Sequence, residues 1–139
     1  MAVVPDESTV SLDLHGKGPH ALGAVRRWLG VELADLSRDC VVDVIQVADE
    51  LTSNAFEHAG GPSTIRVTHD HAASLVTVEV EDEHPAAPTL GRSRFGPGAH
   101  RGRGMVLINE LSCSWGVRGP TADHHTKTVW ARVSCVEEP

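Results

Sequence analysis

The stretch ELTSNAFEHA, residues 50–59, decides the fold, and it continues a helical pattern that begins near residue 39. At 3.6 residues per turn, Glu50, Asn54, Glu57 and His58 share one side of this helix. A carboxylate one turn from an amide suits a hard metal ion with a proton acceptor beside it. Taken alone, such a flank is more often solvated surface, so the rest of the chain decides between the two interpretations.

The same helix carries a separate apolar stripe, which indicates that another face packs against a core. The stripe consists of Val41, Val44, Ile45, Ala48, Leu51 and Ala55. Gly60, Gly61 and Pro62 follow directly, and this combination is a strong signal for the end of a helix. We therefore expect one long helix over residues 39–59.

Composition limits the function classes. The chain has 139 residues, 40% of them hydrophobic, which suits one globular domain with a core. A net charge of −7 argues against general nucleic-acid binding, which needs clustered lysine and arginine. Three Trp, two Phe and no Tyr offer few surfaces for base stacking. An anionic ligand must therefore be met locally, by a metal ion, backbone amides or a few arginines.

The three cysteines, Cys40, Cys113 and Cys135, are scattered and have no paired metal-ligand spacing. We expect reduced, buried thiols in a cytoplasmic protein, although Cys113 and Cys135 lie near predicted strands and could approach each other. The sequence shows no secretory pattern at its start and no apolar run long enough for a bilayer.

The remaining patterns predict five strands and two further helices. Strands are expected at residues 10–14, 63–68, 75–82, 114–117 and 126–133, and helices at 21–29 and 104–111. Residues 31–37 fit either a short helix or a loop, and the turn at 69–73 suggests an antiparallel hairpin. Together these elements predict one domain over residues 1–139 of the α+β class. We expect a two-layer sandwich, with a mixed, mostly antiparallel sheet and its helices on one face.

No periodicity is visible between Glu83 and Arg103, where any regular element is interrupted by Pro85, Pro88, Gly91, Gly96, Pro97 and Gly98. A loop of about 20 residues in a small domain is usually a functional lid or disordered. It holds Arg92, Arg94 and Arg101, so positive charge concentrates here in an otherwise acidic chain.

Four separated pieces carry a resemblance to a known family. They are Glu50-xxx-Asn54 on the long helix, Asp82 at a strand end, Gly102-Arg103-Gly104-Met105 after the loop, and Lys127-Thr128-Val129-Trp130 on the last strand. In order and spacing they resemble the GHKL, or histidine kinase-like, ATPase superfamily with its Bergerat-type ATP-binding fold. The likeness extends from the first strand to Val133. Within the superfamily, the chain looks most similar to RsbW-like anti-sigma serine kinases and to stand-alone ATP-binding regulators of actinomycetes.

The resemblance implies two residues for the reaction and its metal ion. Asn54 corresponds to the ligand of Mg²⁺, an ion that prefers oxygen donors and is shared with substrate phosphates. Glu50 corresponds to the general base that orients a hydroxyl nucleophile.

The resemblance also implies the groups that bind ATP. Asp82 would accept a hydrogen bond from the adenine amine, and Thr128 would reach adenine through water. Gly102 and Gly104 would let the backbone approach the triphosphate at a helix N-terminus, next to Met105. Arg101 and Arg103 are the better arginine candidates for anion contact, while Arg92 and Arg94 fit a solvated loop. His58 either approaches the phosphates or interacts with the helix end electrostatically.

One feature departs from the family. Its first glycine box usually reads Asp-x-Gly-x-Gly, whereas this chain has Asp82-Glu83-His84-Pro85-Ala86 and lacks both glycines. A tight backbone approach to adenine is therefore less assured, which weakens the expectation of tight nucleotide binding and efficient catalysis.

The resemblance implies an anti-sigma factor of the RsbW type. Such a protein binds Mg-ATP, sequesters a sigma factor and phosphorylates a serine on a STAS-type antagonist, and it pairs as a homodimer without nucleic-acid or membrane partners. The alternative is a regulatory module that binds ATP and switches protein partners without phosphotransfer, which the missing glycines favour. The catalytic part of a histidine kinase is a weaker option, because the sequence shows no phospho-acceptor helical domain ahead of it.

Nine histidines raise the question of a transition-metal site. His69 and His71 are spaced to point to one side of an extended segment, and His124 and His125 form a second pair. Zinc sites need three or four ligands with supporting hydrogen bonds, and the sequence indicates no such set. We therefore expect these histidines to lie on the surface.

Overall fold

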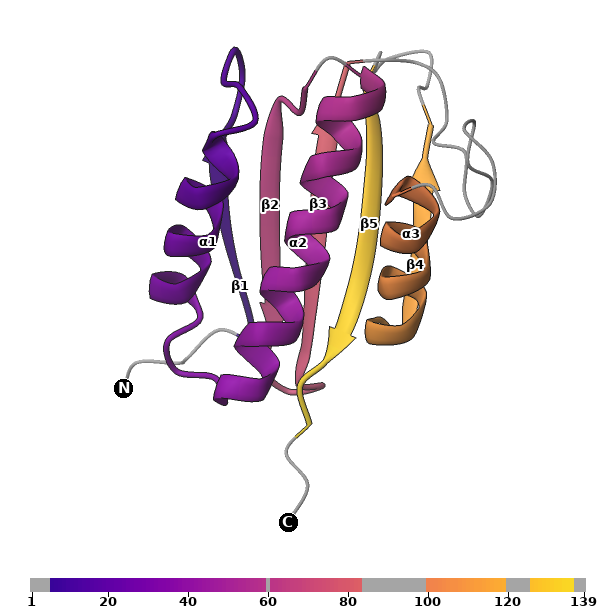
Figure 1. The fold of residues 1–139 in the computed structure, drawn as a ribbon. Coiled ribbons are helices and arrows are strands. Elements are labelled where there is room, and N and C mark those ends of the chain that lie inside the picture. The colour runs from indigo at the N-terminus through magenta and orange to yellow at the C-terminus, as the bar shows by residue number, and fades with distance from the viewer. Residues whose placement is uncertain (1–5, 60, 84–99, 120–125, 137–139) are drawn as a thin grey trace.

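The computed structural model describes residues 6–59, 61–83, 100–119 and 126–136, except for the side chains of residues 58, 59 and 100–105. The elements in chain order are β1 (Glu7–Asp13), α1 (Ala21–Glu32), α2 (Arg38–Ala59), β2 (Thr64–Asp70), β3 (Leu75–Asp82), α3 (His100–Leu111), β4 (Ser114–Arg118) and β5 (Lys127–Ser134). The five strands form one sheet in the order β1-β2-β3-β5-β4. Figure 1 shows all three helices on the same face of this sheet. The predicted two-layer α+β sandwich is confirmed.

The sheet is antiparallel in each of its four described strand pairings, so the mixed character that the sequence suggested is not seen in this part of the chain. Alternation along the strands explains why one face packs against the helices. In the pairing of β3 with β5, Val78 lies opposite Ala131 and both are buried. Their neighbours Glu79 and Trp130 lie opposite each other on the open face, where Glu79 forms an ion pair with Arg118.

Helix α2 crosses the middle of the sheet, between α1 and α3 (Figure 1). Its 22 residues give a length of about 33 Å. Val44, Ala48, Leu51 and Ala55 are buried as predicted, but the expected Val41 and Ile45 are only partly buried. The helix presents Cys40 and Val47 to the core as well. The apolar stripe is therefore wider than predicted and extends toward α3.

Glycine ends α2 where the sequence indicated. Gly61 has φ +121°, a conformation that side chains other than glycine rarely adopt. Its N–H donates to the Ala55 carbonyl at 3.0 Å, which satisfies a carbonyl that the helix end would otherwise leave unpaired.

Two elements begin earlier than expected. Strand β1 starts at Glu7 rather than Val10, because backbone pairing with β2 extends it through Ser8 and Thr9, which no apolar alternation marks. Helix α3 starts at His100 rather than Gly104. The ambiguous residues 31–37 divide between the end of α1 and a turn that leads into α2.

The expectation of free, buried thiols is wrong for all three cysteines, since two are bonded to each other and the third is exposed. Cys40, in the first turn of α2, and Cys135, directly after β5, form a disulfide with their Cα atoms 5.3 Å apart. They are 95 residues apart in the sequence and meet because the start of α2 lies over the end of β5. Cys113 is free but exposed, and its thiol donates to the Arg132 carbonyl rather than approaching Cys135.

Within the described part of the chain, no helix combines the length and the apolar character that crossing a bilayer requires.

Candidate functional site

Helix α2 presents two different flanks on either side of its buried stripe. Asp49 accepts hydrogen bonds from the Arg26 guanidinium of α1 at 3.0 and 3.1 Å, so this flank faces α1. Glu50 and Asn54 lie about 100° and 140° further round the helix, on the opposite flank, toward α3. Both are half-buried. The structure therefore brings the two residues together, one turn apart, on the side where α2 meets α3.

Asp82 is the last residue of β3 and lies on the face of the sheet that the helices cover. Its side chain is almost inaccessible, at 1% exposure, and its Oδ2 lies 3.5 Å from the Nζ of Lys127. Lys127 is the cross-strand partner of Asp82 at the start of β5 and is 3% exposed. A buried carboxylate costs several kcal/mol to desolvate unless it is paired, and Lys127 supplies the compensating charge.

Lys127 is the residue that our sequence reasoning missed. It stands in the last-strand segment that carries the resemblance, but its role was not recognised. The period of two along β5 contained the necessary signal, because Lys127, Val129 and Ala131 share the buried face. A lysine continuing an apolar row at a strand end requires a buried anionic partner.

The structure does not bring Thr128 together with Asp82. Thr128 lies opposite Glu81 across the β3–β5 pairing, one residue out of step with Asp82 and Lys127. Successive side chains of a strand point to opposite faces, so Thr128 faces away from the helices. The position beside Asp82 belongs to Lys127.

The glycine segment differs from its expected setting. We predicted a helix that starts near Gly104 and is preceded by Gly102, but both glycines lie within the helix that starts at His100. Only the first four N–H groups of a helix lack an internal acceptor, so the amide of Gly102 remains available to an anion and that of Gly104 does not. The two glycines weaken this helical turn, each by about 0.5–1 kcal/mol relative to alanine.

Several predicted contributions lie outside the described residues. They are the loop between Glu83 and His100 with Arg92 and Arg94, and the side chains of His58, Arg101, Arg103 and Met105. The backbone of His58 lies in the last turn of α2, and those of Arg101, Arg103 and Met105 lie in α3.

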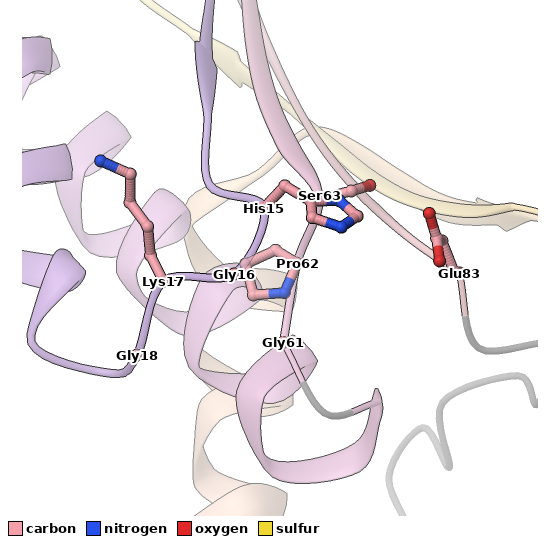
Figure 2. A pocket seen from close by; sticks show the side chains of 8 residues that line it. All are labelled: His15, Gly16, Lys17, Gly18, Gly61, Pro62, Ser63 and Glu83. Atoms are coloured by element: carbon pink, nitrogen blue, oxygen red, sulfur yellow. The ribbon is translucent and has the colours of Figure 1, made fainter.

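A pocket of about 350 Å³ opens at the same end of the sheet (Figure 2). The turn after β1, the segment before β2 and Glu83 line it, through His15, Gly16, Lys17, Gly18, Gly61, Pro62, Ser63 and Glu83. Figure 2 shows Lys17 pointing away from His15 and Glu83. Glu50, Asn54 and Asp82 are not among its described lining, although Glu83 directly follows Asp82 in the chain.

The candidate site thus combines two chemical functions. The carboxamide oxygen of Asn54 and the carboxylate of Glu50 form an oxygen donor set, and oxygen is the ligand type that Mg²⁺ prefers. The ionised carboxylate of Asp82 only accepts hydrogen bonds, which suits recognition of an amine donor on a ligand. These residues come from the middle of α2 and from the end of β3, on the helix-covered face of the sheet.

Comparison with known proteins identifies the fold family. A family model described as the histidine kinase-like ATPase domain matches residues 17–132, which is most of the chain and includes Glu50, Asn54, Asp82 and Lys127. A search of curated proteins gave no match. A domain of this kind implies nucleotide binding, typically of ATP with Mg²⁺. The chain belongs to the histidine kinase-like ATPase domain family.

Proposed function

We propose that this chain is an anti-sigma factor of the RsbW type, a serine-protein kinase that works in the cytoplasm as a homodimer. It binds Mg-ATP, sequesters a sigma factor and phosphorylates a serine on a STAS-type antagonist. One observation carries the proposal: Glu50 and Asn54 lie one turn apart on the flank of α2 that faces α3, in a chain of the histidine kinase-like ATPase family.

The proposed roles follow from the chemistry of the side chains. Asn54 would hold Mg²⁺, which when bound neutralises charge on the phosphate oxygens. Glu50, one turn away, accepts the proton of the attacking serine hydroxyl as that oxygen bonds to the γ-phosphorus and the bond to ADP breaks. Half-burial of both side chains favours this role, because electrostatic interactions strengthen where water is partly excluded.

The ion pair between Asp82 and Lys127 is relevant to how the site would recognise the nucleotide base. Lys127 compensates the charge of Asp82, so the carboxylate stays an acceptor for the exocyclic amine of adenine. Guanine presents an acceptor at the corresponding position and would face the carboxylate with like polarity. We therefore propose that Asp82 selects ATP over GTP.

The second candidate function is a regulatory module that binds ATP and exchanges protein partners without phosphotransfer. The absence of both glycines after Asp82 favours it.

Phosphate transfer separates the two candidates. The chain is incubated with γ-labelled ATP, Mg²⁺ and the STAS-type proteins of the same genome, while calorimetry measures nucleotide binding independently. We expect label on serine of one antagonist, a loss of about 10²–10⁴-fold in rate for Glu50→Gln, and retained nucleotide binding by that variant. Glu57→Gln, which changes an exposed carboxylate about two turns along α2, serves as the matched control.

Each other outcome has a definite meaning. Nucleotide binding without label on any antagonist rejects the kinase and leaves the regulatory module. Full transfer by both Glu50→Gln and Asn54→Ala shows that the catalytic residues are assigned wrongly. Sigma-factor binding is scored separately by sedimentation with and without Mg-ATP, which also reports whether the protein is a dimer.

A further inference from the structure

A second cluster of side chains lies at the other end of the sheet, opposite the end that holds Asp82. His69 is the penultimate residue of β2, and His71 follows the strand directly. The backbone N–H of His71 donates to the Asp6 carbonyl at 2.8 Å, so pairing with the segment before β1 keeps the chain extended as far as His71. Residues two apart in an extended segment point the same way, and the two imidazole rings meet with centroids 3.9 Å apart.

A carboxylate completes the cluster. Asp35 reaches it from the turn between α1 and α2, more than 30 residues away in the sequence. One ligand atom from each of Asp35, His69 and His71 lies within 4.8 Å of the others. Glu32 lines the same small cavity, of about 100 Å³, and adds a further acidic group. Two imidazoles and a carboxylate from two separate segments thus converge on one point.

The surroundings hold the rings in place. Ser8 on β1 lies opposite His69 in the strand register, and its Oγ is 3.0 Å from Nε2 of His71. Ligating histidines almost always have their other ring nitrogen held by such a hydrogen bond. His69 is only 9% exposed, so its ring has little freedom to turn away. The expectation that these histidines lie on the surface is therefore wrong for His69.

The electrostatics of the cluster also suit a cation. An unprotonated ring nitrogen offers a lone pair to a metal ion, and two imidazole rings meet here. The carboxylates supply negative charge that an ion would neutralise.

We propose that Asp35, His69 and His71 bind a first-row divalent transition metal ion, with Zn²⁺ as the principal candidate and Ser8 as a positioning residue. Imidazole suits this class of ion, whereas Mg²⁺ and Ca²⁺ prefer an all-oxygen set. Zinc–ligand bonds near 2.1 Å place tetrahedral ligand atoms about 3.4 Å apart. The side chains must therefore close by at most about 1.4 Å, and the exposed Asp35 is able to make most of that movement. The bound ion would tie the α1–α2 turn to the edge of the sheet.

Calorimetry with zinc alone tests the site. The untagged full-length chain is stripped with EDTA, dialysed, and titrated with Zn²⁺ in the absence of nucleotide. The Cys113→Ser background removes the exposed thiol as a competing ligand. We expect one equivalent per chain, and a loss of affinity of at least about tenfold for His71→Gln and for Asp35→Asn. His20→Gln, which changes an exposed histidine at the start of α1, should bind as the background does.

A second set of measurements guards against variants that merely misfold. Circular dichroism in EDTA checks that Asp35→Asn and His71→Gln keep the fold, and Co²⁺ added to the unaltered chain should give the intense visible bands of a tetrahedral site. Ser8→Ala should weaken Zn²⁺ binding less than loss of a ligand does, while leaving one equivalent. The proposal is overturned if the chain takes up no stoichiometric Zn²⁺, or if folded Asp35→Asn and His71→Gln bind it as tightly as the background.

Discussion

The two ends of the sheet assemble their polar clusters in different ways. At one end, Glu50 and Asn54 are neighbours on a single helix, four positions apart in the sequence. At the other end, Asp35 and His69 come from different elements that are more than 30 residues apart, and only folding brings them together. The first arrangement can be recognised from the sequence, because the fixed period of a helix places residues four positions apart on one side. The second cannot, because strand register and the path of a turn create it.

The two ends also differ in which groups compensate the charges of their polar side chains. Asp82 and Lys127 form a nearly inaccessible ion pair beside the candidate nucleotide site. The cluster of Asp35, His69 and His71 holds two imidazoles in contact, with a carboxylate and with Ser8, at the edge of the sheet. The buried pair already compensates its own charge, whereas the cluster of Asp35, His69 and His71 is proposed to take up a cation.

The largest effect is expected at the buried ion pair. Lys127→Met should lower the free energy of unfolding by about 3–5 kcal/mol, because it removes the cationic partner of the buried Asp82 carboxylate. Adding Asp82→Leu should recover much of this loss, since an apolar pair of similar volume needs no compensation. Urea unfolding followed by circular dichroism measures both.

The exposed pair between α1 and α2 provides the control for this prediction. Arg26→Met breaks the contact with Asp49, and it should cost less than about 1 kcal/mol because the Arg26 side chain is 52% exposed. A loss for Lys127→Met as small as that for Arg26→Met would contradict the interpretation of Lys127 as the partner of a buried charge.

The disulfide offers the next largest effect. Cys135→Ser opens a covalent loop of about 95 residues, and loops of this length typically contribute 2–4 kcal/mol. In a reducing cytoplasm the same contribution would be lost without mutation. Thermal unfolding with and without a reductant measures it. We expect a reductant to lower the unfolding temperature of the unaltered chain and not that of Cys135→Ser. If the reductant changes both unfolding temperatures equally, the disulfide does not form.

A variant at one site should bind the ligand of the other site normally, if the two sites are independent. Asn54→Ala should weaken Mg²⁺-dependent ATP binding at least tenfold, about 1.4 kcal/mol, and leave Zn²⁺ binding unchanged. His71→Gln should weaken Zn²⁺ binding and leave Mg²⁺-dependent ATP binding unchanged. Calorimetric titrations with each ligand alone test this, and weakening of both ligands by one variant would mean that it perturbs the whole fold rather than one site.

The smallest effect concerns pH. Burial and His71 lower the pKa of His69 below its ordinary value of 6.5, so the unfolded chain binds a proton more readily than the folded one. In EDTA, the free energy of unfolding should therefore be unaffected by His69 above pH 6.5 and fall as the pH drops below it, by at most about 1.4 kcal/mol per pH unit. His69→Gln should reduce the slope of the free energy of unfolding against pH below pH 6.5. An unchanged slope in that variant would contradict the assignment of this pH dependence to His69.

Much of the fold was predictable because periodicity reports it directly. The apolar alternation of residues 75–82 and the stripe on α2 both reflect which side chains face the core. The start of β1 was missed because Ser8 and Thr9 are held by pairing rather than by apolar burial. The start of α3 was missed because Gly102 reads as a helix breaker, although its segment is helical.

The candidate site was predictable only in part. The shared flank of Glu50 and Asn54 was recognised from their spacing, whereas the site role of Asp82 came from the family resemblance, and the roles of all three stay predictions. The family resemblance assigned Thr128 to adenine through water, which stays a prediction, and the register of β3 with β5 adds that Lys127 lies beside Asp82. A shift of one residue moves a side chain to the other face of a sheet, and composition does not report that choice.

By itself, the sequence determined the α+β class, the long central helix and the pairing of a carboxylate with an amide on one flank of it. Local periodicities of 3.6 and 2 residues are enough for those conclusions, since they depend only on near neighbours in the chain. Only the tertiary structure decided that Lys127 pairs with Asp82, that Cys40 meets Cys135, and that His69 and His71 converge with Asp35. These contacts join residues that are 34–95 positions apart, and their geometry depends on strand register and on how the helices lie across the sheet.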